Sequence, residues 1–234
     1  MRCTHRLEPF IAAFADFPAS QGKKVLEIGV GLGADHQCFA EAEADLYGID
    51  LTERAVEHTR RRLALFGLSS NLSVGDAEKL DFPDESFDLV YSWGVLHHSP
   101  NTPLAIDEVY RVLKQGGSAK VMIYHKQSMV GFMLWLRYAI LTGKPWLSFD
   151  TIYATHLESP GTKAYSIKEA QNLFSRFSNV KISTTLTHGD LLESNAGQKH
   201  RGLALMLARK LWPRWFIRRF LPKSGLFMLI DARK

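Results

Sequence analysis

The residues with the clearest chemical meaning follow one short buried segment. Gly29, Gly31 and Gly33 come directly after the apolar residues 25–28 and before a helical pattern over 34–43. Glycines here let the backbone turn sharply and approach a ligand closely, and the helix that follows presents unpaired N–H groups. The pattern therefore predicts a ligand-binding loop, although three glycines also fit an ordinary turn between a strand and a helix.

Two aspartates favour the ligand-binding interpretation. Asp50 ends the next expected strand, 21 positions after Gly29, where a carboxylate can accept both hydroxyls of a ribose. Asp76 ends the third expected strand, where it could instead serve as a turn or helix-cap residue. Because open α/β sheets bind ligands at the carboxyl ends of their strands, we expect the loop and both acids to line one site.

A parallel sheet wrapped by helices must hold these residues, since strand-like and helix-like segments alternate along the first half of the chain. The expected strands are residues 25–28, 46–49, 72–74, 87–91, 119–123, 180–186 and 226–230. Thr52 and Thr102 are expected to cap two of the helices, and Gly116 and Gly117 to end the second of these.

The alternation breaks after residue 123. Residues 129–141 predict a nearly all-apolar helix within an irregular stretch, and the capping box of Ser166 and Glu169 marks the return to a regular pattern. The expected organisation is a single domain over residues 1–234, with 127–165 as a helical substrate-lid insertion and 190–223 as a basic helical insertion. A helix in the core, in a dimer interface or against a membrane surface would have the same apolar sequence.

Length and composition narrow the class of protein. The chain has 234 residues, of which 46% are hydrophobic and 23% charged, as in a globular domain. No apolar run reaches the roughly 18 residues of a transmembrane helix. The N-terminal segment lacks the order of a signal peptide, so we expect a cytoplasmic protein. Cys3 and Cys38 are too few for a disulfide framework and have no zinc-site spacing, so both are expected to be thiols.

The net charge of +5 is unevenly distributed. Residues 199–234 carry +9, whereas residues 1–198 carry −4. Because the main part of the chain is not basic, no nucleic-acid partner is expected. Residues 208–223 interleave basic and aromatic side chains, which is typical of a weak peripheral membrane contact and also of an ordinary helix with its apolar face on the core.

Five motifs resemble those of class I S-adenosylmethionine-dependent methyltransferases, in the small-molecule branch that includes the ubiquinone and menaquinone biosynthesis methyltransferases. The motifs are EIGVGLG at 27–33, YGIDL at 47–51, VGDAEKLDFP at 74–83, FDLVYSWGVLHH at 87–98, and Glu108 followed by RVLKQGG at 111–117. The resemblance covers about residues 24–124. It implies an α/β, Rossmann-like, seven-stranded sheet of strand order 3-2-1-4-5-7-6, with the last strand antiparallel and helices on both faces.

The resemblance also implies S-adenosylmethionine as the cofactor. The cofactor-binding residues that it implies are Glu27, Gly29 and Gly31 for the methionyl part, Gly33 in the same loop, Asp50 for the ribose hydroxyls, Leu51, Asp76 and Ala77 for the adenine, and Ser92 for the ammonium group. The implied reaction is transfer of the sulfonium methyl group to an acceptor by in-line displacement.

Such a transfer requires alignment and exclusion of water more than acid–base chemistry. A base is needed only for an acceptor that starts protonated. His98 and His97 are the candidate bases because imidazole titrates near neutral pH, and they could instead shape the loop after the fourth strand. No metal site is expected, since the two histidines are adjacent and no third ligand has suitable spacing.

The candidate substrate-binding residues lie in or just before the irregular stretch 127–165. They are Tyr124, Trp135, Tyr153 and His156. Because residues 129–136 have almost no polar side chains, the expected acceptor is a small, apolar or lipid-like molecule. The sequence leaves the methylated atom open, and it fits both a monomer and a homodimer.

Two other functions fit part of the same pattern. Gly29, Gly31, Ala34 and Asp50 match the fingerprint of a nicotinamide-dependent oxidoreductase, which assigns no role to Asp76. A non-catalytic S-adenosylmethionine-binding module would use the basic C-terminal segment as its working part. The intact set of cofactor motifs favours the enzyme.

Overall fold

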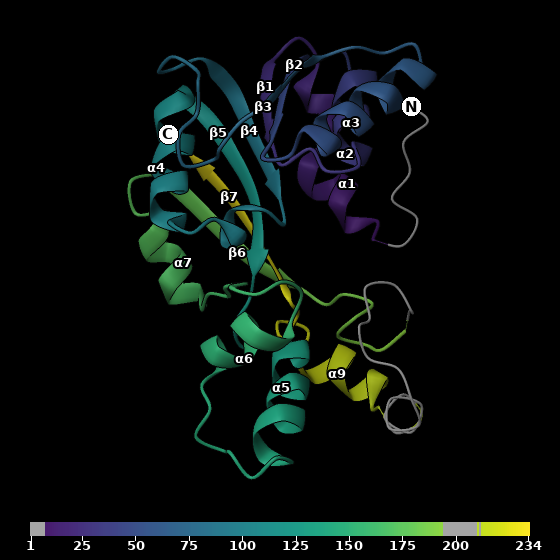
Figure 1. Ribbon diagram of the computed structural model, residues 1–234, viewed down its shortest axis with the longest axis vertical. Helices are drawn as coiled ribbons and strands as arrows, with labels where there is room; N and C mark the ends of the chain where they lie inside the picture. The colour runs from purple at the N-terminus through teal and green to yellow at the C-terminus, as the bar shows by residue number, and fades with distance from the viewer. Residues whose placement is uncertain (1–7, 194–209, 211) are drawn as a thin grey trace. The chain divides into compact units, whose positions relative to one another are not determined.

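The central feature of the fold is a seven-stranded sheet with the strand order β3-β2-β1-β4-β5-β7-β6. The computed structural model describes residues 8–193, 210 and 212–234 (Figure 1). The strands are β1 (Lys24–Ile28), β2 (Asp45–Asp50), β3 (Asn71–Val74), β4 (Phe87–Trp93), β5 (Leu113–Tyr124), β6 (Ser178–Thr185) and β7 (Phe227–Arg233). Strands β1 to β5 pair in parallel, so the predicted α/β class and strand order are confirmed.

The last strand runs antiparallel to β5. At one end the N–H of Gly116 donates to the carbonyl of Lys234, and at the other the N–H of His125 donates to the carbonyl of Leu226. The prediction that Gly116 and Gly117 end a helix is wrong. Helix α4 (Thr102–Val112) passes directly into β5, and Gly116 adopts φ 76° within that strand, a conformation that suits glycine.

The chain divides into two compact units. The first comprises Met1–Met122, Gln171–Lys181 and Ile230–Lys234, and the second comprises Ile123–Ala170 and Ile182–Leu229. The helices of the first unit are α1 (Phe10–Ala15), η1 (Phe17–Ser20), α2 (Ala34–Glu41), α3 (Glu53–Leu65), η2 (Leu96–His98) and α4. Those of the second are α5 (Met129–Trp135), η3 (Leu136–Ile140), α6 (Phe149–His156) and α9 (Arg214–Phe220), while α7 (Ile167–Leu173) crosses the boundary in sequence.

Helix caps follow the sequence closely, with one shift. The hydroxyl of Thr52 accepts the N–H of Ala55 at 3.3 Å, which confirms the predicted cap of α3. The predicted cap at Thr102 is wrong, because the side chain of Asn101 accepts the N–H of Leu104 and caps α4 instead. The hydroxyl of Thr102 is buried and donates to the carbonyl of Leu96 at 3.2 Å, so it is not available to the helix end.

An aromatic core holds the helix that follows the glycine loop. Phe39 of α2 packs edge-on against Phe17 at 4.7 Å and against Tyr91 of β4 at 5.1 Å between ring centroids. The hydroxyl of Tyr91 donates to Asp35 in the first turn of α2, at 2.6 Å. Cys38 lies in the same core and is disulfide-bonded, so the expectation of a thiol is wrong there; Cys3 lies outside the described residues.

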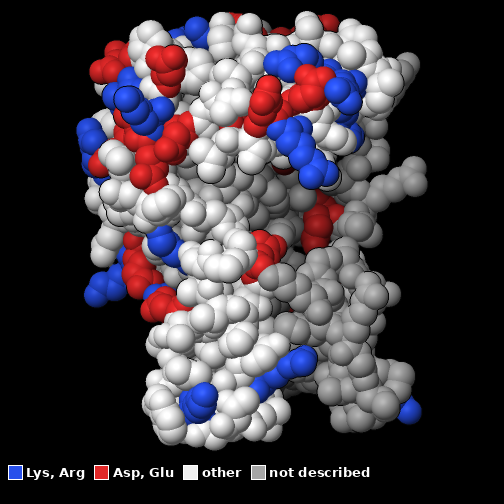
Figure 2. Space-filling model, viewed as in Figure 1, with Lys and Arg blue, Asp and Glu red and all other residues white. Residues whose placement is uncertain are grey.

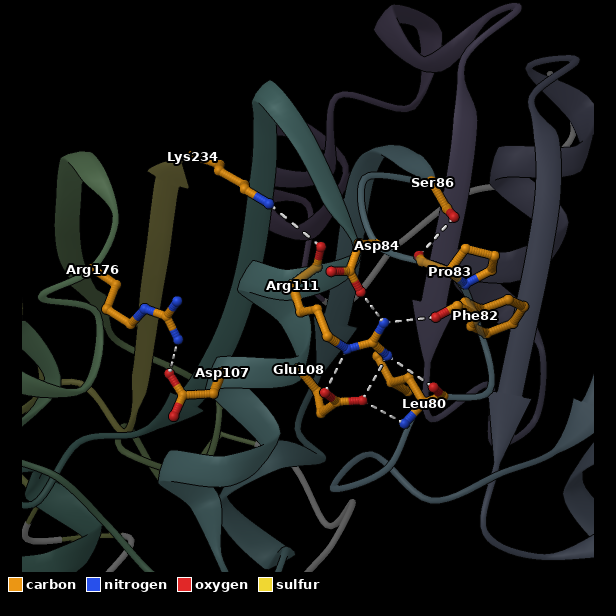
Figure 3. Close-up of polar contacts among 10 residues, drawn as sticks. All are labelled: Leu80, Phe82, Pro83, Asp84, Ser86, Asp107, Glu108, Arg111, Arg176 and Lys234. Carbon is orange, nitrogen blue, oxygen red and sulfur yellow. Dashed lines mark hydrogen bonds and ion pairs between the residues drawn. The ribbon is translucent and has the colours of Figure 1, made fainter.

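An arginine clamp ties the loop after β3 to α4 (Figure 3). The guanidinium of Arg111 donates to Glu108 and Asp84 and to the carbonyls of Leu80 and Phe82, at 2.7–2.9 Å. Glu108 in turn accepts the N–H of Leu80 at 2.8 Å. The Arg111 guanidinium holds the pKa of Glu108 below its usual range. The clamp restrains the segment that begins at the third strand's carboxyl end.

The second unit has a small core of its own. Leu134, Ala139 and Ile152 are buried, and Trp135 and Tyr138 pack against them. The helix predicted over residues 129–141 is α5 followed by the π-helical turn η3. The capping box is confirmed, since the backbone N–H of each of Ser166 and Glu169 donates to the other's side chain. Among the described residues, no helix has the length and apolar character needed to cross a membrane.

Candidate functional site

A cavity of about 160 Å³ lies at the carboxyl ends of β1 and β2 and beside the segment that follows β3. All of its lining residues belong to the first unit. They are Ile28, Gly29, Ile49, Asp50, Leu51, Gly75, Asp76, Ala77, Val95, His98, Ser99 and Pro100. Six residues predicted from the sequence thus lie around one cavity: Gly29, Asp50, Leu51, Asp76, Ala77 and His98.

The glycine loop has little room for side chains where it meets the cavity. Gly29 adopts φ 85°, and a Cβ there would lie 2.1 Å from the side chain of Val95. Gly31 adopts φ 51° and has open space on its Cβ side, whereas Gly33 packs against Thr59. The loop therefore needs glycine for packing at two positions, while at Gly31 the positive φ favours glycine and the Cβ side is open.

Asp50 both lines the cavity and holds the glycine loop. One carboxylate oxygen accepts the N–H of Gly31 at 3.1 Å. The other accepts the N–H and the hydroxyl of Thr52, at 3.0 and 2.9 Å. Each carboxylate oxygen has two lone pairs, so Asp50 retains acceptor capacity for a ligand hydroxyl.

The cavity wall that contains Asp76 is held by a residue that the sequence interpretation missed. Asp76 accepts the N–H of Glu78 at 2.9 Å. One carboxylate oxygen of Glu78 accepts the hydroxyl of Ser99 at 2.5 Å and the N–H of Asn101 at 2.6 Å. Glu78 therefore joins the Asp76–Ala77 wall to the wall that contains His98, Ser99 and Pro100. Its only signal in the sequence was its place inside the motif at 74–83.

Glu27 and Ser92 do not line the cavity. Glu27 is 3% exposed, and its carboxylate lies 2.8 Å from Nδ1 of His36, whose Nε2 lies 2.7 Å from the hydroxyl of Ser70. Burial, with repulsion from nearby acids, raises the pKa of Glu27 well above its usual value, and burial lowers the pKa of His36 to about 3. Both directions favour the uncharged forms of this pair. The hydroxyl of Ser92 donates to the carbonyl of Ile28 inside the sheet.

The two adjacent histidines have different surroundings. His98 lines the cavity. His97 is fully buried, and its ring centroid lies 4.2 Å from that of His98. Burial, with a smaller contribution from His98, lowers the pKa of His97 well below its usual value. Only His98 is placed to exchange a proton with a ligand in the cavity.

The four candidate substrate-binding residues make contacts within the second unit. Tyr153 is fully buried, and its hydroxyl lies 2.7 Å from that of Ser128 and bonds the backbone carbonyls of residues 125 and 126. Trp135 donates to the carbonyl of Leu147 at 3.0 Å. The remaining two stack on aromatic rings: Tyr124 on Phe227 and His156 on Tyr138. Burial raises the pKa of Tyr124 and of Tyr153.

A larger cavity, of about 380 Å³, lies beside the arginine clamp. Its lining residues are Asp84, Glu85, Tyr110, Arg111, Arg176 and Lys234. Each of its cations already has a carboxylate partner within 4 Å, so we assign no ligand to it. Within the described ranges, no group of three or more His, Cys, Asp or Glu side chains is arranged to hold a metal ion.

The smaller cavity fits the nucleoside part of a cofactor. Its volume is below the roughly 300–1,000 Å³ of pockets that enclose a whole ligand. Asp50 and Asp76 supply acceptors for hydroxyl and amino groups, while Leu51, 73% exposed, presents apolar surface. This donor and acceptor set matches a ribose with an attached base.

Comparison with known proteins identifies the segment that builds this cavity. Residues 26–121 match the family model described as a methyltransferase domain. This segment resembles a methyltransferase domain. The predicted resemblance to the class I methyltransferases is therefore confirmed, and all five motifs lie within the matched residues.

Curated relatives match the methyltransferase domain but extend well beyond it. A sterol 24-C-methyltransferase of Aspergillus fumigatus is 33% identical over 121 residues, which are 47% of this chain and 32% of that protein. A demethylmenaquinone methyltransferase of Tropheryma whipplei is 33% identical over 123 residues, 51% of this chain and 50% of that protein. The chain thus spans half or less of the length of these relatives.

Solved structures show the same fold over nearly the whole chain. An S-adenosylmethionine-dependent methyltransferase from Mesorhizobium loti superposes with a TM-score of 0.62 and 20% identity, covering 98% of this chain and 99% of that one. The second unit is therefore part of the fold that this neighbour shares with the chain.

Proposed function

We propose that the chain transfers a methyl group from S-adenosylmethionine to a small, apolar or lipid-like acceptor by in-line displacement. The observation that carries the proposal is the single cavity of the methyltransferase domain that Gly29, Asp50, Asp76 and Ala77 line together. A nicotinamide-dependent oxidoreductase would leave Asp76 and the Glu78 bridge without a role.

The residues of the cavity would bind the nucleoside part of the cofactor. Asp50 would accept the ribose hydroxyls, Leu51 would cover one face of the adenine, and Asp76 with the N–H of Ala77 would bond its edge. The methionyl part would lie over the loop of Gly29 and Gly31, and we propose that the carbonyl of Ser92 receives the ammonium group there. When bound, S-adenosylmethionine supplies an electrophilic methyl group on a sulfonium, so the protein must align the acceptor and exclude water.

Glu27 would act through the loop. Its carboxyl group is occupied by His36, and only Ile28 separates it from Gly29. We propose that the buried chain of Ser70, His36 and Glu27 keeps the end of β1 in register with the methionyl site. Gly33 has the same supporting role through its contact with Thr59.

His98 is the proposed base for an acceptor hydroxyl. A ring nitrogen of His98 would take the hydroxyl proton as the oxygen attacks the methyl group. His97, buried directly behind it, would hold the ring of His98 in place rather than exchange protons. For a thiol, amine or carboxylate acceptor no base is required.

The acceptor class rests on the second unit and on the curated relatives. By their names, those relatives act on a sterol and on a demethylmenaquinone, both apolar molecules. We propose that residues 127–165 cover the acceptor, with Tyr124, Trp135, Tyr153 and His156 shaping that region from within its core. We also propose that the protein is cytoplasmic and is a monomer or a homodimer. We further propose that residues 208–223 contact a membrane. Of the basic insertion at 190–223, residues 194–209 and 211 lie outside the described part.

Calorimetric titration with S-adenosylmethionine and S-adenosylhomocysteine tests the proposal. Asp50→Asn should weaken both affinities by about tenfold or more, because a charge-assisted hydrogen bond contributes about 1.5–3 kcal/mol. Asp45→Asn, at the opposite end of the same strand and exposed, is the matched control. Equal affinity of Asp50→Asn and the unmodified chain would remove the ribose assignment, and tighter binding of NAD would favour the oxidoreductase.

A further inference from the structure

Two segments of the second unit contain basic residues and no acidic ones. Residues 127–148 carry two basic side chains, and residues 210–225 carry five. Neither segment contains an Asp or Glu. Both segments therefore carry net positive charge, and Arg218 pairs with Glu193, which lies outside its segment, at 2.7 Å.

The first of these segments exposes apolar side chains at regular spacing. Phe132, Leu136 and Ile140 are 45%, 51% and 38% exposed and lie four residues apart along α5 and η3. The turn that follows exposes Leu141 and Trp146, both at 75%. Figure 2 shows the surface over α5 as largely white with isolated blue groups.

The second segment exposes aromatic rings beside its arginines. In α9 only Ile217 is buried, while Trp215, Phe216 and Phe220 are 74%, 48% and 55% exposed. The ring of Phe220 contacts those of Trp215 and Phe216, at 5.9 and 4.8 Å between centroids. Arg214 and Arg218 bond to residues 191–193, but a helix with one buried apolar side chain and three exposed aromatic ones leaves most of its apolar surface in water.

One buried carboxylate connects the two segments. Asp190 is 0% exposed and accepts the N–H of Val130 in α5 at 3.3 Å and the N–H of Leu226, just after the second segment, at 2.9 Å. Its backbone carbonyl accepts the indole N–H of Trp212, just before α9, at 2.9 Å. Helices α5 and α9 are therefore held to the same point of the unit.

We propose that α5, η3, the turn to Trp146 and α9 together form a docking face for a bilayer that contains anionic lipid. Tryptophan and phenylalanine side chains partition into the headgroup boundary, and arginine and lysine beside them are attracted to anionic headgroups. This inference rests on the proposed function, since a lipid-like acceptor would reach the enzyme from a membrane. It extends the contact expected for residues 208–223 by a second element, which lies in the segment expected to form the lid.

Co-sedimentation of the full chain with vesicles tests the docking face. At low salt the chain should sediment with vesicles of phosphatidylcholine and phosphatidylserine and not with phosphatidylcholine alone, and added salt should release it. Trp146→Ala and Trp215→Ala should each weaken binding by about tenfold. Lys144→Gln with Arg219→Gln, one cation from each segment, should weaken it by about fivefold per cation.

Exposed positions of the first unit supply matched controls. Phe66→Ala and Arg54→Gln remove a similar ring and a similar charge from α3 and the residue after it, and should leave vesicle binding unchanged. Far-ultraviolet circular dichroism should be the same for all variants, because every replaced side chain is exposed. As a second readout, brominated lipids should quench Trp146 and Trp215, so the quenching should fall in Trp146→Phe and in Trp215→Phe.

Three results would overturn the docking face. The first is that the chain does not sediment with anionic vesicles at low salt. The second is that Trp146→Ala sediments as well as the unmodified chain, which would show that α5 and the turn after it are not part of the docking face. The third is that only the Lys144→Gln, Arg219→Gln variant loses vesicle binding and that the unmodified chain binds RNA as tightly as it binds vesicles. That result would indicate a surface that binds any polyanion. Titration of the same samples with S-adenosylmethionine separates the proposals: a chain that binds the cofactor and ignores vesicles contradicts the docking face alone.

Discussion

The methyltransferase domain and the second unit use their polar residues differently. In the domain, six predicted site residues line a single cavity at the ends of parallel strands. In the second unit, the hydroxyl of Tyr153 and the indole N–H of Trp135 are bonded within the unit's own core. The end of a strand fixes the position of the side chain that follows it. In an irregular stretch, the position of a side chain depends on contacts with residues far away in the sequence.

Replacing His98 should give the largest effect and tests the cavity side of the comparison. With an acceptor hydroxyl, His98→Ala should lower turnover by about 10²–10⁴-fold, because general-base catalysis contributes that range. Cofactor affinity should change little. Turnover is measured across neutral pH, with the exposed His58→Ala as control. Turnover equal to that of the unmodified chain would indicate an acceptor that needs no base.

Truncation of Tyr153 tests whether the second unit uses this residue as core. Tyr153→Ala should lower the free energy of unfolding by ~3–5 kcal/mol, and Tyr153→Phe by ~1–3 kcal/mol because it leaves buried partners unbonded. Both variants should bind S-adenosylmethionine normally. Urea denaturation and calorimetry provide the two measurements. A stable Tyr153→Phe variant with a raised KM for the acceptor would instead place the hydroxyl in the acceptor site.

Replacing Glu78 tests whether a polar residue next to the cavity acts by holding its walls together. Glu78→Ala should weaken S-adenosylmethionine binding by about tenfold, because the walls that contain Asp76 and His98 lose their shared acceptor. Glu78→Gln keeps an acceptor oxygen and should restore most of the affinity. Lys79→Ala is the neighbouring control. For a positioning residue, KM for the cofactor should rise while kcat stays the same, and a fall in kcat alone would contradict this role.

The buried histidine should give the smallest effect, seen only as a function of pH. The pKa of His97 is lowered in the folded state, so below its unfolded value of about 6.5 the unfolded chain binds more protons. Its contribution to stability should therefore be constant above pH 6.5 and fall below it by up to about 1.4 kcal/mol per pH unit.

His97→Leu isolates this contribution. Its free energy of unfolding should fall less steeply than that of the unmodified chain as the pH drops below about 6.5. Other groups, including the buried His36, titrate in both proteins and cancel in the difference. Identical slopes for the two proteins would show that His97 takes up its proton in the folded state.

Much of the site could be predicted because strand ends are visible in a sequence. Apolar runs, glycines and the acids that follow them locate the carboxyl edge of a parallel sheet, and hence Gly29, Asp50 and Asp76. The cap at Thr52 was equally local, since it involves residues three apart. At Thr102 the cap moved by one residue to Asn101, because the hydroxyl of Thr102 bonds the carbonyl of Leu96 in the preceding turn.

By itself, the sequence determined the fold class, the strand order implied by the motifs, and which loop borders the cavity. Only the tertiary structure decided that Glu27 pairs with His36 and that His98, not His97, faces the cavity. It also decided that Glu78 bridges two walls. The physical reason is that periodicity reports which face of an element is buried, whereas the partner of a buried polar group comes from a segment many residues away.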